Sequence, residues 1–159
     1  MYSHFSRVDS KNYSFVIFDL PNDVKLPKYI NEIVKNGPKA SVWVHACDRM
    51  YDPEPLLKEG VALYDLRFED GKTPDKSILD RWSKILGDHK NETIAVHCIA
   101  GLGRAPLLVA IALIMDEWDV LTAIQEIRRV RPGALNIPQI KFLQAYKNRS
   151  KRVKPCLLL

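Results

Sequence analysis

Short runs of β-branched and aromatic residues recur along the first two thirds of the chain, separated by proline, glycine and polar residues. Runs of this length and composition are typical of β-strands. They predict four strands, at residues 14–20, 40–46, 61–66 and 93–97. The last run is apolar at almost every position, which indicates a central strand with both faces covered.

Apolar residues spaced three and four apart predict helices between and after these strands. Five are expected, at residues 27–37, 73–87, 106–118, 121–130 and 138–146. Thr73 is expected to cap the second, with Pro74 as its first helical residue, and Asn136 to cap the last. The helix at 106–118 is apolar on nearly every side, so we expect it to be buried between layers.

Strands that alternate with helices, followed by a helical C-terminal half, predict an α/β fold. We expect a single compact domain with a central, mostly parallel sheet flanked by helices. The composition agrees, since the 159 residues are 47% hydrophobic and 27% charged. The longest apolar run, residues 105–115, is shorter than the roughly 18 residues that a membrane-spanning helix needs. The first five residues have no apolar core, which predicts that no secretory signal is present, and three cysteines then indicate no disulfide framework.

The net charge of +5 is concentrated at the C-terminal end. Five of the 24 basic residues lie in residues 147–154, which contain no acidic residue, so the rest of the chain balances 19 bases with 19 acids. This predicts a neutral domain over residues 1–146 and a basic tail over residues 147–159. A neutral domain argues against a nucleic-acid-binding protein, which would carry a basic face. By its charge alone, the tail is equally compatible with a solvated chain end.

The candidate chemistry lies in the stretch His97-Cys98-Ile99-Ala100-Gly101-Leu102-Gly103-Arg104, which contains Cys-x5-Arg between a predicted strand and a predicted helix. A loop that closes onto a helix N-terminus directs its backbone N–H groups inward, where the helix dipole adds positive potential. Gly101 and Gly103 permit the unusual dihedral angles of such a loop. Arg104 can bind two phosphoryl oxygens at once, and the positive environment favours a thiolate at Cys98 that can attack phosphorus.

The alternative for this stretch is a buried cysteine and a surface arginine in an ordinary turn. The preceding histidine, the two glycines and the strand-to-helix context argue against it. His97 by itself is equally typical of a core residue at a strand end, and we expect it to support the loop and the thiolate rather than to carry a proton.

Transfer of a phosphoryl group to a thiolate also requires an acid that protonates the departing oxygen. Glu69 and Asp70, just after the third predicted strand, are two adjacent candidates. The alternative is an ordinary turn with solvated carboxylates.

Residues 97–106, which end in Ala105-Pro106, resemble the signature of protein tyrosine phosphatases, and closely that of the phosphatase of regenerating liver (PRL, type IVA) family. The likeness extends to residues 44–52, 68–71, 131–136 with Gln139, and 156–159. It implies a fold like that of the dual-specificity phosphatases, with Cys98 as nucleophile, Arg104 as phosphate clamp and Asp70 as general acid. The backbone from Ile99 to Gly103 would bind phosphate, with His97, Ala105 and Gln139 in support. No metal and no cofactor is expected.

Two positions bear on the expected activity. Leu66-Arg67 stand where the acid loop of the family usually begins Trp-Pro, which leaves the positioning of Asp70 open. Arg67 could instead supply a cation beside an acidic substrate. Ala105 stands where most phosphatases of this superfamily have a serine or threonine whose hydroxyl assists release of the thiolate. PRL proteins share this alanine, which implies slow breakdown of a phosphocysteine and slow turnover.

The other two cysteines suggest regulation and attachment. A buried structural role is the default for Cys47, but it matches the PRL cysteine that can pair with the nucleophile, which implies a reversible Cys47–Cys98 disulfide. His45 and Cys47 have the spacing of a metal-binding pair without a second pair, so no metal site is expected. Cys156 lies in a C-a-a-X prenylation box, and the terminal Leu159 favours a geranylgeranyl group.

The basic tail would supply the second signal that stable attachment to an anionic leaflet requires. PRL chains usually end with two adjacent cysteines and a different last residue, so the type of prenyl group stays open, and a coincidental tail is the alternative. Prenylation, with methylation of the new C-terminus, would place the protein at the cytoplasmic face of the plasma membrane and endosomes. Without the prenyl group it would be soluble in the cytoplasm or nucleus.

The sequence therefore predicts a membrane-anchored, cysteine-dependent tyrosine or dual-specificity phosphatase whose substrates are phosphotyrosine proteins or a phosphoinositide. The alternative is a prenylated, pseudophosphatase-like binding module that docks CNNM magnesium transport mediators, the partners that the PRL resemblance implies. The resemblance also allows a homotrimer, and no nucleic-acid partner is expected.

Overall fold

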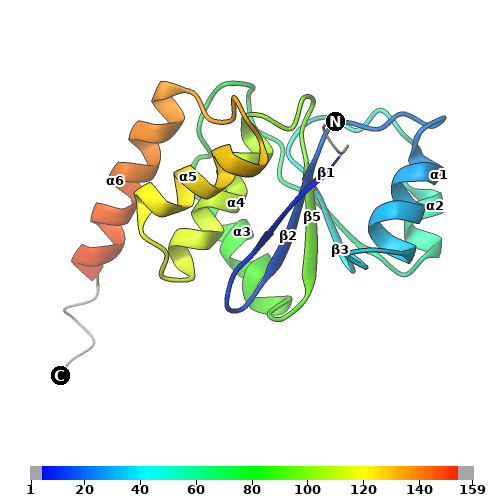
Figure 1. The fold of residues 1–159 in the computed structure, drawn as a ribbon, viewed down its shortest axis with the longest axis horizontal. Coiled ribbons are helices and arrows are strands. Elements are labelled where there is room, and N and C mark those ends of the chain that lie inside the picture. The colour runs from blue at the N-terminus through cyan, green and yellow to red at the C-terminus, as the bar shows by residue number, and fades with distance from the viewer. Residues whose placement is uncertain (1–4, 154–159) are drawn as a thin grey trace.

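The computed structural model describes residues 5–153, with side chains as far as Tyr146, and contains one five-stranded sheet (Figure 1). The strands are β1 (Phe5–Asp9), β2 (Ser14–Phe18), β3 (Val42–His45), β4 (Ala62–Asp65) and β5 (Thr93–His97), in the order β1-β2-β5-β3-β4. β1 is antiparallel to β2, and every other neighbouring pair is parallel. The prediction of an α/β domain with a mostly parallel sheet is confirmed.

Helices cover both faces of the sheet (Figure 1). One face carries α3 (Lys76–Asp88), α4 (Arg104–Met115), α5 (Val120–Val130) and α6 (Ile137–Val153), and the other carries α1 (Leu26–Tyr29), the π-helical η1 (Ile30–Lys35) and α2 (Glu54–Lys58). Because β3, β4 and β5 are parallel, the segments that follow them meet at one edge of the sheet. These segments carry Cys47, Asp70 and Cys98 respectively.

All four predicted strands are present, and the structure adds a fifth, β1, which has no run of apolar residues. Residues 93–97 form β5 with the predicted bounds, and the other three predicted strands are present but shorter. β1 has only two apolar residues, Phe5 and Val8, and its place in the sheet comes from its pairing with β2 at the edge. A strand with one neighbour and one covered face needs few apolar residues, so its sequence resembles a loop.

Several helix boundaries differ from the prediction. The side chain of Asp75 accepts the N–H of Ile78 at 2.9 Å and caps α3, so the expectation that Thr73 is the cap and Pro74 the first helical residue is wrong. Capping by Asp75 begins the helix at the register that buries Ile78. The helix expected at 27–37 divides into α1 and η1, α2 is an additional short helix, and α4 begins earlier than predicted, at Arg104.

α6 begins at Ile137, one residue before the predicted start, and Asn136 is its cap as predicted. The side chain of Asn136 accepts the N–H of Gln139 at 2.9 Å, while Gln139 Oε1 accepts the N–H of Asn136 at 3.1 Å. This reciprocal pair is a capping box. The helix continues to Val153, into the first part of the basic tail; the domain boundary after residue 146 stays a prediction.

The apolar helix α4 lies in the larger of two buried clusters, as expected from its composition. Its residues from Arg104 to Ile114 are all buried. Trp82 of α3 donates its indole N–H to the carbonyl of Leu108 at 2.8 Å. Burial on all sides fixes the position of α4, and with it the helix N-terminus that follows the Cys-x5-Arg loop.

A buried polar chain lies beneath the end of β5. Tyr51 Oη is 3.0 Å from Trp43 Nε1 and 2.7 Å from His97 Nε2. An indole N–H can only donate, so Tyr51 accepts from Trp43. The carbonyl of Cys98 can only accept and lies 3.3 Å from His97 Nδ1, so the ring proton of His97 is on Nδ1. His97 Nε2 then accepts the hydroxyl proton of Tyr51. Burial lowers the pKa of His97 to about 3, so the ring is neutral at physiological pH.

This lowered pKa makes the stability of the fold depend on pH. The ring has a pKa of about 6.5 in an unfolded chain. As the pH falls from 7 to 5, the unfolded state therefore takes up a proton that the folded state does not. The stability gained by keeping His97 neutral is complete above about pH 6.5 and decreases below it, by at most about 1.4 kcal/mol per pH unit for one group. His45, whose pKa burial also lowers, acts in the same direction.

We predict that the free energy of unfolding in urea decreases as the pH is lowered from 7 to 5. His97→Asn should begin from a lower stability at pH 7, because it disrupts the chain through Tyr51, and should then change less with pH. Urea titrations at pH 7, 6 and 5 measure both quantities. Parallel pH dependences for the two proteins would contradict the assignment to His97.

Candidate active site

The Cys-x5-Arg loop connects β5 to α4. Cys98 is buried directly after β5, and Arg104 is the first residue of α4. The strand before the loop is tied to its neighbour where Ala46 donates its N–H to the carbonyl of His97 at 2.9 Å. Both ends of the loop are thus fixed by buried elements.

The carbonyl groups of the loop are bound on its outer side. Leu20 donates its N–H to Ile99 O at 2.9 Å, and Leu135 donates its N–H to Leu102 O at 2.9 Å. Between them, Arg131 donates from Nη2 to Ala100 O and from Nε to Gly101 O, each at 3.1 Å.

With these carbonyls turned outward, the N–H groups of the loop are free for a ligand. Among the described residues, no hydrogen bond has the N–H of any residue from Ile99 to Gly103 as its donor. Successive N–H groups that converge before a helix N-terminus form an anion-binding nest. The loop can therefore hold a phosphoryl group.

Gly101 is required by this packing. Its φ is +71°, and an added Cβ would lie 2.2 Å from Arg131 Nη2 and 2.9 Å from the carbonyl oxygen of Phe18. Gly103 has a φ of −122°, and its neighbour is Gln139, 3.5 Å from the position of a Cβ. The left-handed conformation that favours glycine thus occurs at Gly101 and not at Gly103.

The segment after α5 braces the loop from behind. Leu135 adopts a left-handed conformation, with a φ of 69°, where its N–H reaches Leu102. Arg128 holds this segment by donating to the carbonyls of Ala134 and Leu135, each at 2.9 Å. The local sequence does not show that Arg131 or Arg128 supports the loop. The partners of Arg131 lie about thirty residues away in the chain, and those of Arg128 lie in the turn after α5. Only the tertiary structure gives them this role.

Arg104 lies between the Cys-x5-Arg loop and the acidic segment, residues 68–72, which carries Glu69 and Asp70. Its side chain is 8% exposed, and Nη1 donates to the carbonyl of Phe68 at 3.1 Å. Its Nε is buried, has no hydrogen-bond partner among the described residues, and lies 3.6 Å from Asp70 Oδ1. An unsatisfied buried donor is costly, by about 1–3 kcal/mol. An oxyanion bound in the loop would satisfy it.

The acidic segment is a turn, and the turn places Asp70 beside Arg104. Lys72 donates its N–H to Glu69 O at 3.1 Å, and Gly71 has a φ of +72°. The Asp70 side chain is 81% exposed, so it combines solvent access with proximity to Arg104. Glu69 lies along the wall of the adjacent cavity.

Gln139 and Asn136 join the acidic segment to α6. Gln139 is completely buried and donates to Lys72 O at 3.3 Å, while Asn136 donates to Gly71 O at 3.1 Å. Because Gln139 also lies against Gly103, the capping box of α6 contacts both the acidic segment and the Cys-x5-Arg loop. The structure thus brings Gln139 together with the candidate catalytic residues.

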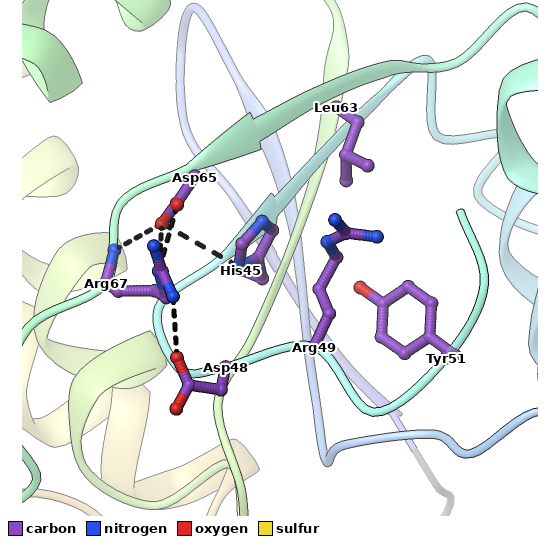
Figure 2. Close-up of a pocket in the computed structure, with 7 residues that line it drawn as sticks. All are labelled: His45, Asp48, Arg49, Tyr51, Leu63, Asp65 and Arg67. Atoms are coloured by element: carbon purple, nitrogen blue, oxygen red, sulfur yellow. Dashed lines mark hydrogen bonds and ion pairs between the residues drawn. The ribbon is translucent and has the colours of Figure 1, made fainter. Parts of the chain in front are cut away.

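Two cavities open at this edge of the sheet. One, of about 480 Å³, is lined by Cys47, Asp48, Asp65, Arg67, Phe68, Glu69, Arg81 and Arg104. The other, of about 660 Å³, is lined by His45, Asp48, Arg49, Tyr51, Leu63, Asp65 and Arg67 (Figure 2). They share three charged residues, Asp48, Asp65 and Arg67, which stand between them.

Cys47 lies close to both the loop and the buried histidine. Its Sγ is 3.8 Å from His97 Nδ1, and both Cys47 and Cys98 are free thiols. Burial, followed by the nearby Cys98, raises the pKa of Cys47 to about 11. Cys47 is therefore a protonated thiol at neutral pH. Within the part of the chain that the structure describes, no three side chains of the metal-ligating types are grouped to hold a metal ion.

The predicted attachment signals lie outside the residues that the structure describes. Cys156 and Leu159 are outside the described residues, as are the side chains of the basic tail. None of the helices between residues 5 and 153 has the length and apolar character needed to cross a bilayer.

Comparisons with known proteins agree with this geometry. The family profile described as "Protein-tyrosine phosphatase" matches residues 68–149. A probable protein tyrosine phosphatase type IVA A from Dictyostelium discoideum is 47% identical over 150 residues, which cover 92% of this chain and 89% of the relative. The PRL-1 phosphatase of Drosophila melanogaster is 38% identical over 148 residues, covering 91% of this chain and 83% of the relative.

Solved structures show the same fold. A putative protein tyrosine phosphatase from Leishmania major superposes with a TM-score of 0.79 at 32% identity, covering 89% of this chain and 97% of that one. With its identity to the type IVA proteins over about nine-tenths of its length, this chain belongs to the PRL, or type IVA, family and is a protein tyrosine phosphatase.

Proposed function

We propose that this protein is a membrane-anchored phosphatase that acts through a phosphocysteine at Cys98 and turns over slowly. The observation that carries the proposal is the set of N–H groups from Ile99 to Gly103, which have no hydrogen-bond acceptor among the described residues and lie in the loop between Cys98 and the buried Arg104. A phosphoryl group held by these donors would lie within the loop that Cys98 begins. Proteins that carry phosphotyrosine are the substrate class that fits the family.

In the first step the Cys98 thiolate attacks phosphorus. The S–P bond forms as the ester P–O bond breaks, and the departing oxygen takes a proton from the carboxyl group of Asp70. Arg104 and the loop N–H groups stabilise the charge on the nonbridging oxygens throughout, because they are already oriented before the substrate binds. Asp70 is the candidate for this task because its carboxyl group lies at the site, 3.6 Å from Arg104 Nε, and is open to solvent.

In the second step water attacks the phosphocysteine. It gives a proton to the Asp70 carboxylate, the S–P bond breaks, and Cys98 leaves as a thiolate with inorganic phosphate as the product. Ala105 follows Arg104 in α4, is completely buried, and has no hydroxyl to offer the departing sulfur. We therefore expect this step to limit turnover.

Attachment to membranes would follow from Cys156 and the basic tail. A single prenyl chain gives marginal binding, and the basic residues would add roughly 1 kcal/mol each on an anionic leaflet. The combination would place the enzyme at the cytoplasmic face of the plasma membrane and endosomes. A phosphoinositide in that leaflet is a second substrate class for the same anion-binding loop.

Oxidation would switch the enzyme off reversibly. A Cys47–Cys98 disulfide would form as both thiols lose their hydrogens to an oxidant such as hydrogen peroxide, and a cellular thiol would reduce it again. The support is the position of Cys47, whose ionisation is sensitive to Cys98 and whose Sγ lies beside His97.

A binding function without turnover is the second candidate. The buried Ala105 favours it, because a site that releases its product slowly resembles a docking pocket. Its partners would be the CNNM magnesium transport mediators, with an acidic group of the partner in the place of phosphate.

We predict that the wild-type protein, mixed with an aryl phosphate and quenched in acid, shows one phosphoryl adduct in intact-mass spectra. Cys98→Ser should show none, and Cys47→Ser should retain it. Ala105→Ser should shorten the lifetime of the adduct, since a hydroxyl can assist the thiolate. In protein from a prenylating host, a lipid adduct should be lost in Cys156→Ser. Hydrolysis that continues at the wild-type rate in Cys98→Ser would exclude the phosphocysteine, and absence of any adduct would favour the binding module.

We predict that Asp70→Asn slows reaction with substrates whose leaving oxygen needs a proton. For phenyl phosphate, with a weakly acidic phenol, kcat/KM should decrease about 100-fold. For an aryl phosphate with a strongly acidic phenol the change should be small, because that leaving group departs without protonation. Glu69→Gln is the matched control and should leave both rates close to wild type. An equal loss for both substrates in Asp70→Asn would mean that Asp70 is not the acid.

A further inference from the structure

The two ends of the acidic segment are held in different ways. At its far end, Asn136 and Gln139 bind the carbonyls of Gly71 and Lys72. At its near end, next to β4, the N–H of Phe68 lies 3.4 Å from Ala46 O, and the carbonyl of Phe68 accepts a hydrogen bond from Arg104 Nη1 at 3.1 Å. Further contacts at this end are made by the side chain of the residue before Phe68.

Arg67 supplies those contacts (Figure 2). Its Nε lies 3.0 and 2.9 Å from the two carboxylate oxygens of Asp65, and its Nη1 lies 2.8 Å from Asp48 Oδ1. The backbone N–H of Arg67 donates to Asp65 Oδ1 as well, at 3.0 Å. Asp65 ends β4 and Asp48 follows Cys47 after β3, so one guanidinium joins the ends of two parallel strands.

The end of β4, where Asp65 lies, is held in place by buried and hydrogen-bonded neighbours. Leu66, between Asp65 and Arg67, is completely buried, and the carbonyl of Asp65 accepts a hydrogen bond from Arg81 of α3 at 2.5 Å. The hydrogen bonds from Arg67 also lower the pKa of Asp65, which keeps its carboxylate charged. These three residues, Arg67, Asp65 and Asp48, are called the clasp. The clasp connects the fixed strand ends to the acidic segment that follows Arg67.

The side chain of Asp70 lies mostly in solvent. Its side chain is 81% exposed, and Arg104 is the one ion-pair partner that it has among the described residues. Apart from this ion pair, the exposed carboxyl group is placed by the backbone of residues 68–72, and hence by the contacts at the two ends of that segment.

We propose that Arg67 is a positioning residue for the general acid: its ion pairs with Asp65 and Asp48 hold the near end of residues 68–72, so that Asp70 reaches the departing oxygen. The proposal rests on the role of Asp70 given above. General acid catalysis is sensitive to distances of an ångström or less. A loop that pivots about Phe68 would therefore lose proton transfer while the anion-binding loop stays intact.

The same contacts argue against a direct role of Arg67 in binding an acidic substrate. Two carboxylates already bind its guanidinium, so the three residues together carry a net negative charge. An acidic substrate would have to displace a carboxylate to reach it.

The ion pairs of the clasp are open to solvent, where dissolved salt can weaken them. The side chains of Arg67, Asp48 and Asp65 are 54%, 78% and 41% exposed. Ion pairs of this kind contribute little to global stability and are weakened by salt. The positioning of Asp70 should therefore depend on ionic strength far more than the fold does.

The test compares Arg67→Ala with wild type across aryl phosphates whose phenols range from strongly to weakly acidic. We expect a loss in kcat/KM of about tenfold for phenyl phosphate and less than about twofold for the most acidic phenol. Arg67→Lys should lie between, because an ammonium group cannot hold both partners in the same way. Because salt also weakens binding of any anionic substrate, the informative quantity is the ratio of the rate for phenyl phosphate to the rate for the most acidic phenol. Added salt should lower this ratio in wild type and leave it nearly unchanged in Arg67→Ala.

Arg129→Ala is the matched control, since Arg129 forms an exposed ion pair with Glu126 on α5, away from the site. It should behave as wild type with every substrate. If Arg67→Ala does not fold, Asp48→Asn removes one of the two pairs and should show part of the same selective loss. Thermal unfolding of each variant separates these effects from a loss of folded protein.

An equal loss across the series would overturn the proposal, as would a rise in KM confined to acidic phosphopeptides, which would assign Arg67 to substrate binding. The outcome is separable from the role of Asp70. If Asp70→Asn shows the selective loss and Arg67→Ala does not, the clasp alone is refuted. If Asp70→Asn shows none, the acid itself is misassigned.

Discussion

The outward anchoring of the Cys-x5-Arg loop is the constraint on which the rest of the site depends. Four successive carbonyls, from Ile99 to Leu102, are bound by Leu20, Arg131 and Leu135. Because buried backbone groups require partners, fixing the carbonyls outside leaves the N–H groups to face the inside. Arg131 occupies the space beside Gly101 that any Cβ would need. The anion-binding surface is thus made by partners that never touch the anion.

The two halves of the site differ in how they are supported. The side that carries Cys98, the proposed nucleophile, rests on buried structure: α4 is covered on every side, and His97 accepts a hydrogen bond from Tyr51. The acid side is an exposed turn whose place is set by side-chain contacts at its ends. A rigidly supported loop and an exposed acidic turn suit a reaction in which the anion binds first and a proton is delivered afterwards.

Much of this could be predicted from local sequence, and the failures have physical causes. The core strand β5 and the apolar α4 follow from their composition, and the cap of α6 at Asn136 from its residue type. Thr73 and Asp75 are both suitable caps, and the burial of Ile78 decided between them. β1 resembles a loop because an edge strand needs few apolar residues.

The sequence by itself determined the α/β fold, the loop that carries Cys98 and Arg104, and the adjacent carboxylates Glu69 and Asp70. Each of these depends on residues that are close together in the chain. Only the tertiary structure decided what holds them: Arg131 behind the loop, Gln139 between loop and turn, and Arg67 across two strand ends. These contacts join residues that are far apart in the chain or lie on different strands. No local pattern encodes them, because they arise only when the parallel strands bring their carboxyl ends to the same edge.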